Sequence, residues 1–276
     1  MGILYVVATP IGNLEDISAR AQRVLSEVGL IGAEDTRTAR VLLTRYEIRP
    51  PELISYTEHN RARRIPHILQ RLATTDVALV SDAGTPAVSD PGIELVAAAR
   101  AAGHDVVAVP GPSAVAAAVS VSGLRVATFR FIGFLPRSKG DVRRVLEEQA
   151  TRPEALVAFE SPQRLLDSLA AIDETLTETR IAVCRELTKL HEETYVGTAA
   201  EALQHFAEPR GEIVLVIEGA DPNAKAPPVD DEPVRAEIAT MRRLGLTQSQ
   251  ASALLGERYG LQRRRLYELW LQSEAD

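Results

Sequence analysis

The stretch Val-Ala-Leu-Val-Ser-Asp-Ala-Gly-Thr-Pro-Ala-Val-Ser-Asp-Pro-Gly, residues 77–92, decides the fold of this chain. Its four leading apolar residues run directly into a turn with two glycines and two prolines, which restrict the backbone. The turn also holds Asp82, Thr85, Ser89 and Asp90, and we expect an alanine-rich helix after it. This pattern predicts a buried parallel strand that ends at a binding crevice. A well-capped connection between strand and helix is the alternative for this turn taken alone.

The composition is that of a soluble globular protein. With 276 residues, 45% hydrophobic and 25% charged, the chain is long enough for two domains. No apolar run approaches the roughly 20 residues that cross a bilayer, and no basic leader precedes the first strand pattern, so we expect a cytoplasmic protein. Cys184 is the only cysteine, which excludes an internal disulfide. The net charge of −7 argues mildly against a protein coated in nucleic acid but allows a local basic groove.

The first half of the chain alternates apolar runs with helical stretches. Strands are predicted at Ile3–Ala8, Leu30–Ala33, Leu53–Ser55, Val77–Ser81 and Val106–Val109. Each is followed by a helical pattern, and the last of these helices covers residues 113–121. Strands that alternate with helices form a mainly parallel sheet covered on both faces, so residues 1–122 are predicted to be one α/β domain.

A second α/β domain is predicted over residues 123–219. Its strands are expected at Thr128–Phe134, Ala155–Phe159, Ile181–Glu186, Glu192–Val196 and Glu212–Ile217. The third and fourth of these strands have no helix between them, which indicates a hairpin and therefore a mixed sheet.

The remaining residues are predicted to form a linker and a small helical module. Residues 220–233 contain many prolines and too few apolar residues to pack, which is typical of a linker. Residues 234–276 show three short amphipathic helices, and Thr247 with Gln250 has the spacing of a capping box before the second helix. Arginines in this module suggest either an auxiliary RNA contact or a solvated helix face.

Several common ligand motifs are missing from the sequence. It contains no dinucleotide-binding glycine motif and no P-loop, and its five histidines have no metal-ligand spacing, so we expect no metal. Polar turns instead follow all five predicted strands of the first half, at residues 9–14, 34–37, 56–60, 81–92 and 110–113. Because the carboxyl ends of parallel strands lie along one edge, these turns are predicted to converge on one crevice.

The second half places basic residues beside strand ends. Arg137 and Lys139 follow the first strand, Arg164 follows the second, and Arg185 and Lys189 follow the third. Cations in such positions could hold a polyanion, although a single one of them would usually be a surface charge.

These motifs together resemble the ribosomal RNA small subunit methyltransferase I family, which lies within the tetrapyrrole-methylase-like group. The resemblance covers residues 4–219. The segments that carry it are Thr-Pro-Ile-Gly-Asn-Leu (9–14), Ala-Glu-Asp-Thr-Arg (33–37), Glu-His-Asn (58–60), Ser-Asp-Ala-Gly-Thr-Pro (81–86), Ser-Asp-Pro-Gly (89–92), Pro-Gly-Pro-Ser (110–113), Gly-Phe-Leu-Pro-Arg (133–137) and Arg-Glu-Leu-Thr-Lys-Leu-His-Glu-Glu (185–193).

The resemblance implies a fold, a reaction and a cofactor. It implies two α/β domains of the tetrapyrrole methylase type with the cofactor cleft between them. The implied reaction is methylation of the ribose 2′-hydroxyl of a decoding-centre cytidine in 16S ribosomal RNA of the small ribosomal subunit, with S-adenosylmethionine, by a homodimer. The implied cofactor-binding residues are Ile11, Gly12, Asp82, Ala83, Gly84, Thr85, Ser113, Phe159, Leu187 and Glu212. Of the opening loop, residues 82–85 are expected to touch the cofactor, whereas residues 89–92 are expected only to shape the turn.

Methyl transfer from a sulfonium needs neither a metal nor a covalent intermediate. Alignment of the reactants can supply up to roughly 7–11 kcal/mol, against about 3–5 kcal/mol for a general base, so alignment outranks base catalysis. A ribose hydroxyl is nevertheless a poor acid, and Glu34, Asp35 and Glu186 are the candidates to accept its proton. The residues predicted to contact RNA are Arg37, His59, Asn60, Arg137, Lys139, Arg164, Arg185 and Lys189.

Two other functions fit the same fold. One is a methyltransferase for a tetrapyrrole or a similar small molecule, although a porphyrinoid ring needs a broad apolar cleft and only 4% of the residues are aromatic. The other is a protein that binds the ribosome without catalysis.

Overall fold

The computed structural model describes residues 2–220, 231–259, 261 and 263–273. The chain divides into two compact units, residues 1–221 and 222–276, which are described separately. Most of the predicted linker at 220–233 lies outside the described residues. Within the described part of the chain, no helix is long and apolar enough to cross a membrane.

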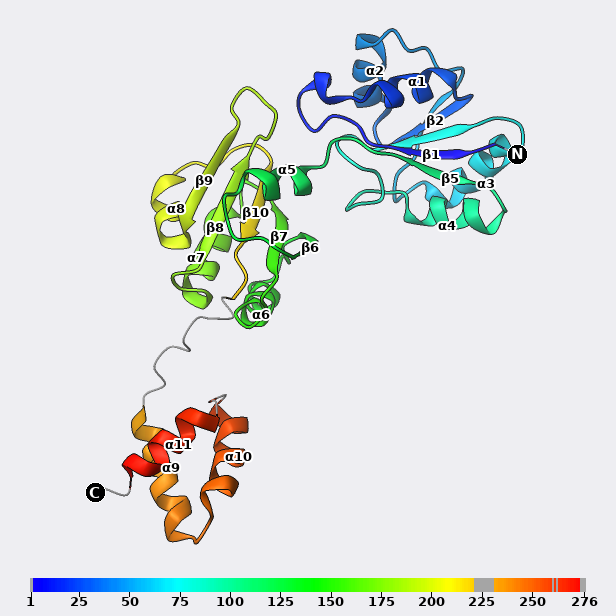
Figure 1. The fold of residues 1–276 in the computed structure, drawn as a ribbon. Helices are drawn as coiled ribbons and strands as arrows, with labels where there is room; N and C mark the ends of the chain where they lie inside the picture. The colour runs from blue at the N-terminus through cyan, green and yellow to red at the C-terminus, as the bar shows by residue number, and fades with distance from the viewer. Residues whose placement is uncertain (1, 221–230, 260, 262, 274–276) are drawn as a thin grey trace. The chain divides into compact units, whose positions relative to one another are not determined.

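The first unit begins with a five-stranded parallel sheet (Figure 1). Its strands are β1 (Leu4–Val7), β2 (Leu30–Ala33), β3 (Leu53–Ser55), β4 (Val77–Val80) and β5 (Val106–Val109). They lie in the order β3-β2-β4-β1-β5, with every neighbouring pair parallel. The predicted parallel sheet is confirmed, and β4, the strand of the opening stretch, lies at its centre between β2 and β1.

Helices cover both faces of this sheet because successive side chains of each strand point to opposite faces. Ala78 and Val80 of β4 pack with α1 (Ala19–Glu27) and α2 (Thr36–Arg45). Val77 and Leu79 pack with α3 (Arg61–Leu72) and α4 (Ile93–Ala101) on the other face. A short 3₁₀ turn, η1 (Leu14–Asp16), precedes α1. The alternation explains why β4 is buried along its whole length.

The second sheet of the first unit is mixed. Its strands are β6 (Phe129–Phe134), β7 (Ala155–Glu160), β8 (Arg180–Arg185), β9 (Glu193–Thr198) and β10 (Ile213–Ile217). They lie in the order β6-β7-β10-β8-β9. Only β6 and β7 are parallel, and β8 and β9 form the predicted antiparallel hairpin. The mixed sheet expected from the missing helix is therefore confirmed.

The second sheet is also covered on both faces. Helices α6 (Lys139–Gln149), α7 (Leu165–Thr175) and α8 (Ala199–His205) pack on one face. The other face is covered by α5 (Ala114–Val121), whose Val115 and Ala118 lie in one apolar cluster with strands β7, β8 and β10. The predicted domain boundary at residue 122 assigned this helix to the first domain. No further strand of the first sheet follows α5, so nothing requires the helix to pack back on that sheet.

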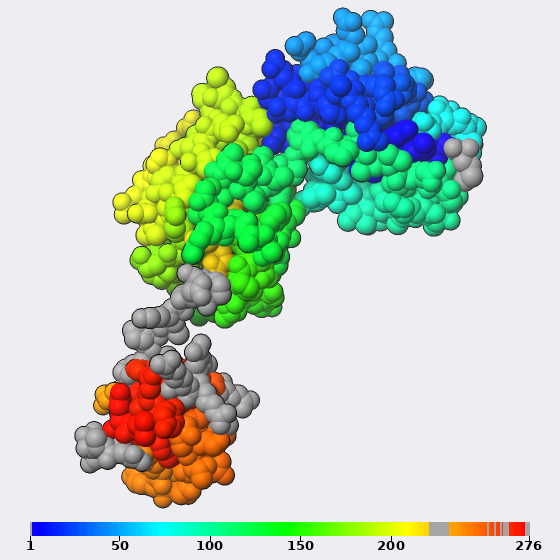
Figure 2. Space-filling view, in the orientation of Figure 1, coloured from blue at the N-terminus to red at the C-terminus, as the bar shows by residue number. Residues whose placement is uncertain are grey.

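The two α/β domains meet where the turn after β1 reaches the turn between β8 and β9. The backbone N–H of Asn13 donates to Oγ1 of Thr188 over 3.0 Å. In the space-filling view the dark blue residues of the first domain adjoin the yellow-green residues of the second at this point (Figure 2). The first unit therefore has a direct polar contact between its two domains.

The described residues of the second unit form helices. Helices α9 (Asp231–Arg243), α10 (Gln248–Tyr259) and α11 (Arg263–Gln272) share an apolar cluster that includes Val234, Leu255 and Leu269. The predicted capping box is present, since the Thr247 N–H donates to Oε1 of Gln250 over 2.9 Å. Helix α9 begins before the predicted Val234 because Pro233 lies in the first turn, where its missing N–H costs little.

Candidate functional site

Hydrogen bonds join the turns that follow the five strands of the first sheet. Thr9 and Gly84 form an isolated bridge, with N···O distances of 2.8 and 3.0 Å between their backbones. Oγ1 of Thr85 donates to the carbonyl of Pro112 over 3.3 Å. These contacts link the turns after β1, β4 and β5.

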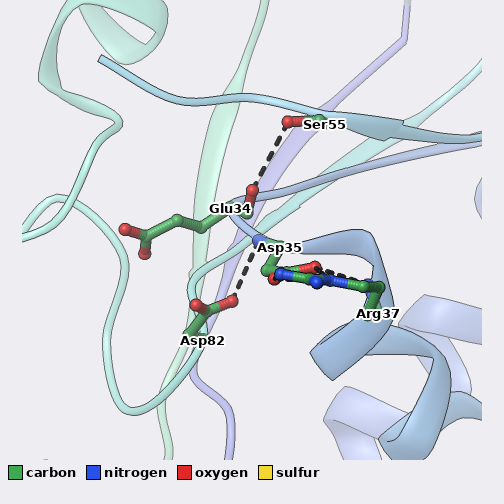
Figure 3. A network of polar contacts seen from close by, with 5 residues as sticks. All are labelled: Glu34, Asp35, Arg37, Ser55 and Asp82. Atoms are coloured by element: carbon green, nitrogen blue, oxygen red, sulfur yellow. Dashed lines mark hydrogen bonds and ion pairs between the residues drawn. The ribbon is translucent and has the colours of Figure 1, made fainter. Parts of the chain in front are cut away.

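The turns after β2 and β3 join the same set (Figure 3). The Asp35 N–H donates to Oδ1 of Asp82 over 2.9 Å, and the Ser55 hydroxyl donates to the carbonyl of Glu34 over 3.4 Å. All five turns therefore meet at one edge of the sheet, as predicted, but only the turns at 9–14, 81–92 and 110–113 line the cavity described below.

The backbone of the loop at residues 81–92 repeatedly enters the left-handed region. Gly84 and Gly92 have positive φ, and so do Ala87 with φ 66° and Ser89 with φ 64°. A side chain in this region costs about 1–3 kcal/mol, and such residues are concentrated at binding sites. A Cβ on Gly92 would lie 2.9 Å from Cδ2 of Leu79, so a side chain there would also force Leu79 to shift.

The loop between β8 and β9 has the same property. Glu186 has φ 52° and Thr188 has φ 67°. This loop and the loop at 81–92 thus hold four of the six non-glycine residues with positive φ in the described chain. Both loops border the cavity described next.

A cavity of about 350 Å³ lies between the ends of the two sheets and is lined by residues of both domains. This volume falls within the range for pockets that hold small molecules. Eight of the residues predicted to bind a cofactor line it: Ile11, Ala83, Gly84, Thr85, Ser113, Phe159, Leu187 and Glu212. The structure therefore brings most of that set together.

Two residues of the predicted cofactor set, Gly12 and Asp82, do not line the cavity. Gly12 allows close approach of the domains, since a Cβ there would lie 2.5 Å from Cγ of Lys189. Asp82 is exposed and instead holds the backbone of Asp35. Ser89 and Asp90 do line the cavity, so the 89–92 segment does more than shape the turn.

Other residues that line the cavity, mostly in the second domain, were not predicted from the sequence. They are Val88, Ala114, Val115, Phe134, Glu160, Ser161, Pro162, Cys184, Gly211, Ile213 and Val214. Many of these lie at strand ends. The start of β10 lies beside the ends of β7 and β8, where Ile213 pairs with Glu160 and Arg185, because β10 is antiparallel to both. The sequence pattern did not reveal this order.

The three predicted catalytic carboxylates have different surroundings. The hydrogen bond from the Arg37 guanidinium lowers the pKa of Asp35 to about 2. The Lys189 ammonium, which lies 2.8 Å from Oε1 of Glu186, lowers the pKa of Glu186. Burial, reinforced by the charges of Asp90 and Asp82, raises the pKa of Glu34. Of the three, Glu34 is the carboxylate whose environment favours accepting a proton.

Asp90 shares the environment of Glu34. Burial raises the pKa of Asp90 and the charge of Asp82 adds to the increase, while a hydrogen bond from Ser81 opposes it. Asp90 lines the cavity and its charge acts on Glu34, which does not itself line the cavity, so the two carboxyl groups with raised pKa values influence each other.

Glu186 belongs to a compact ionic network. Lys189 Nζ lies 2.8 Å from Glu186 and 3.0 Å from Oε2 of Glu212, and the Glu212 N–H donates to Oε1 of Glu186 over 2.9 Å. A Cβ on Gly211 would lie 2.4 Å from Cδ of Glu186, so glycine makes room for this carboxylate. The network fixes one wall of the cavity.

Most of the basic residues predicted to contact RNA are paired within the chain. Arg37 binds Asp35, Arg185 binds Glu193, and Lys189 binds the two glutamates named above. Asn60 holds the turn after β3, where its side chain accepts from the Thr57 N–H and donates to the Ser55 carbonyl. The exposed side chains of His59, Arg137 and Lys139 make no hydrogen bond or ion pair with the described residues.

Arg164 forms an ion pair with a buried carboxylate. The Glu160 side chain is 0% exposed, and its oxygens lie 2.6 Å from Nη2 of Arg164 and 2.5 Å from the Ser168 hydroxyl. Arg164 Nη1 donates to the carbonyls of Leu135 and Pro136 over 3.2 and 3.0 Å. Arg164 therefore fastens the turn after β6 to the end of β7.

No group of three or more His, Cys, Asp or Glu side chains in the described residues has the arrangement needed to hold a metal ion.

We predict that Arg164→Ala destabilises the first unit. The substitution leaves the Glu160 carboxylate buried without its cation. The free energy of unfolding should fall by about 3 kcal/mol, which is the lower end of the range for a broken buried ion pair because Arg164 is partly exposed. Denaturant unfolding monitored by circular dichroism measures this loss. Glu160→Gln combined with Arg164→Ala should recover part of it. The control Arg137→Ala, at an exposed position, should change stability by less than about 0.5 kcal/mol. An unchanged midpoint for Arg164→Ala would contradict the assigned role.

Comparison with known proteins agrees with this architecture. Residues 3–203 match the family model of the tetrapyrrole (corrin/porphyrin) methylases. Among solved structures, uroporphyrin-III-C-methyltransferase from Thermus thermophilus has a TM-score of 0.56 at 22% identity, over 79% of this chain and 94% of that one. The cobalt precorrin-4 methyltransferase has a TM-score of 0.58 at 15% identity, over 78% of this chain and 94% of that one. These two likenesses concern the fold alone.

Sequence relatives are closer. The ribosomal RNA small subunit methyltransferase I of Synechocystis is 45% identical over the full length of both chains. The protein of the same name from Thermotoga maritima is 48% identical over 80% of this chain and all of its own. The chain therefore belongs to the ribosomal RNA small subunit methyltransferase I family and has the tetrapyrrole methylase fold.

Proposed function

We propose that this protein methylates the ribose 2′-hydroxyl of a decoding-centre cytidine in 16S ribosomal RNA, with S-adenosylmethionine as the methyl donor. The observation that carries the proposal is the cavity at the loop edge of the first sheet, lined by both domains and bordered by carboxylates. The names of relatives at 45% and 48% identity support RNA as the substrate.

The cavity suits S-adenosylmethionine in size and chemistry. Apolar side chains such as Ile11, Val115 and Leu187 suit its adenine, and Thr85, Ser113 and the carboxylates supply polar partners for its ribose and amino acid parts. Asp90 is an anion near which a sulfonium charge is favourable. When bound, the cofactor supplies an activated methyl group.

The protein contributes mainly position. The hydrogen-bonded turns after the five strands and the network of Glu186, Lys189 and Glu212 fix the two walls of the cavity. Fixed walls hold the reacting atoms in line, which is the larger part of the rate acceleration in such a transfer. Strained loops that the fold holds in place are suited to this task.

Glu34 is the proposed acceptor of the hydroxyl proton. Among the described residues no cation forms an ion pair with it, whereas Asp35 and Glu186 are each held by one. Burial, and after it the negative charges of Asp90 and Asp82, raises the pKa of Glu34, which favours proton transfer to its carboxylate. Asp35 and Glu186 have lowered pKa values and serve to hold their loops.

The substrate side of the proposal rests on unpaired cations. Arg137 and Lys139 are exposed and unpaired among the described residues, and they follow directly after a strand whose last residue lines the cavity. Phosphates of the RNA can bind there without breaking an internal ion pair. We also propose a cytoplasmic homodimer as the working form.

Methyl transfer to isolated small ribosomal subunits tests the proposal. Subunits from cells that lack this activity are incubated with the protein and labelled S-adenosylmethionine, and the modified nucleotide is mapped. One 2′-O-methylcytidine in the decoding centre is expected. Labelling of a uroporphyrinogen in place of the subunits, or binding of subunits without any transfer, would overturn the proposal in favour of a small-molecule enzyme or a non-catalytic protein.

Glu34→Gln should slow methyl transfer and stabilise the fold. Loss of a general base lowers kcat by about 10²–10⁴-fold, with cofactor affinity nearly unchanged. Because folding raises the pKa of Glu34, the stability linked to its protonation is present below the unfolded pKa and is lost as pH rises through the folded pKa.

The wild-type rate should therefore fall as the pH decreases through the raised pKa of Glu34. Glu34→Gln should be more stable than the wild type at neutral pH, and this advantage should vanish in acid. Rate–pH profiles and thermal unfolding between acidic and neutral pH measure both effects, with the exposed Glu27→Gln as the control. A Glu34→Gln enzyme with an unchanged rate would exclude this role.

Asp82→Ala should weaken cofactor binding indirectly. It removes the acceptor for the Asp35 N–H, which ties the turn after β2 to the loop at 81–92. A hydrogen bond to a charged group contributes about 1.5–3 kcal/mol. If this is lost from cofactor binding, the affinity for S-adenosylmethionine falls by about 10- to 150-fold. Calorimetric titration with S-adenosylmethionine measures it. Asp82→Asn, which keeps the oxygen acceptor, should lose much less, and equal losses for both variants would indicate that the charge itself matters.

A further inference from the structure

An exposed aromatic ring lies at the mouth of the cavity. Phe134, the last residue of β6, is 58% exposed and is one of the residues that line the cavity. Single exposed apolar side chains are common on proteins, so it is the place of Phe134 in the lining of the cavity that distinguishes it. Phe129, at the opposite end of the same strand, is 47% exposed but does not line the cavity.

The ring of Phe134 is held in its position. It packs edge-to-face on Phe159, with ring centroids 5.5 Å apart, and Phe159 packs in turn on Phe131 at 5.0 Å. The pairing of β6 with β7 shifts register between Phe131 and Phe134, and Gly133 has φ 72°. An irregularity of this kind re-aims the side chain that follows it. The strand end is therefore built to present this ring.

The surroundings of Phe134 combine apolar contacts with cations. Val88, from the loop at 81–92, is 43% exposed and lines the same cavity, and a Cβ on Gly133 would lie 3.0 Å from the Ser89 hydroxyl. Arg137 and Lys139 lie three and five residues after Phe134, which limits their Cα atoms to at most about 10 and 18 Å from the Cα of Phe134. An exposed ring beside unpaired cations is the arrangement that binds an unstacked base and its strand.

We propose that Phe134 stacks on a nucleobase of the RNA while Arg137 and Lys139 bind phosphates of the same strand. The base, drawn out of its stack, lies at the mouth of the cavity with its ribose toward Glu34 and Asp90. This inference rests on the proposed function and identifies the second domain as the part that holds the nucleotide. The alternative occupant of the ring, the adenine of the cofactor, is an outcome of the test.

The test compares four variants at position 134 in the full-length protein. Phe134→Leu keeps apolar volume but removes the aromatic face, Phe134→Ala removes both, and Phe134→Tyr and Phe134→Trp keep a face. Loss of stacking should lower kcat/KM for methyl transfer to small subunits by about 5- to 150-fold in the Ala and Leu variants. The Tyr and Trp variants should retain most of the activity.

Two measurements separate stacking from other causes. Calorimetric affinity for S-adenosylmethionine should be unchanged in Phe134→Leu; a parallel loss would assign the ring to the cofactor and overturn the inference. Phe129→Ala, the matched control on the same strand, should keep wild-type kcat/KM, and thermal unfolding reports whether each variant is folded. Wild-type kcat/KM in a folded Phe134→Ala protein would also overturn the inference.

The salt dependence of binding to subunits tests the cations independently. Arg137→Ala with Lys139→Ala should reduce the slope of log K against log salt by about 1.4, that is about 0.7 for each phosphate contact on a single strand. Phe134→Leu should leave the slope of log K against log salt unchanged, because neither phenylalanine nor leucine carries a charge. An unchanged slope in the double variant would remove the phosphate part of the inference. If the wild-type protein transfers no methyl group to subunits, the proposed function itself fails, whatever the variants do.

Discussion

The backbone bridge between Thr9 and Gly84 determines how the rest of the site is built. Their strands, β1 and β4, are neighbours in the first sheet, and the bridge extends that pairing beyond the strand ends. Gly84 adopts φ 78°, which redirects the chain, and Thr85 is then fastened to Pro112. The loop at 81–92 then continues through Ala87 and Ser89, which have positive φ, and reaches Gly133 of the second domain. This approach of the loop to the second domain closes one side of the cavity.

The same edge gathers carboxyl groups and gives them opposite properties. Asp35 and Glu186 each have a cation within hydrogen-bonding distance and are held ionised, which suits a structural role. Glu34 and Asp90 are partly buried beside further negative charge, so protonation is easier for them. Environments that push pKa values apart are the usual way in which a site separates a proton acceptor from its supports.

The strands, the mixed second sheet and the convergence of the turns could be predicted because local patterns encode them. Contacts between residues that only the fold brings together could not be predicted. Arg164 was predicted to contact RNA, and its guanidinium also binds Glu160, the last residue of β7, and two backbone carbonyls, partners that no local sequence pattern indicates. Phe134 was missed because an aromatic residue in a strand is typical of a core, and only its exposure at the cavity distinguishes it.

The distribution of charge is compatible with the proposed binding of RNA by an acidic protein. Glu34, Asp82 and Asp90 lie on the turns of the first domain, whereas Arg137 and Lys139, which have no ion-pair partner among the described residues, lie on the second. Phosphates are repelled by the first set and attracted by the second, and both effects act within a Debye length of about 8–10 Å. In the proposed complex the strand is therefore held on the second domain, and only a neutral ribose needs to approach the carboxylates. A net charge of −7 is then compatible with an RNA substrate, because the local distribution of charge and not the total decides where the strand lies.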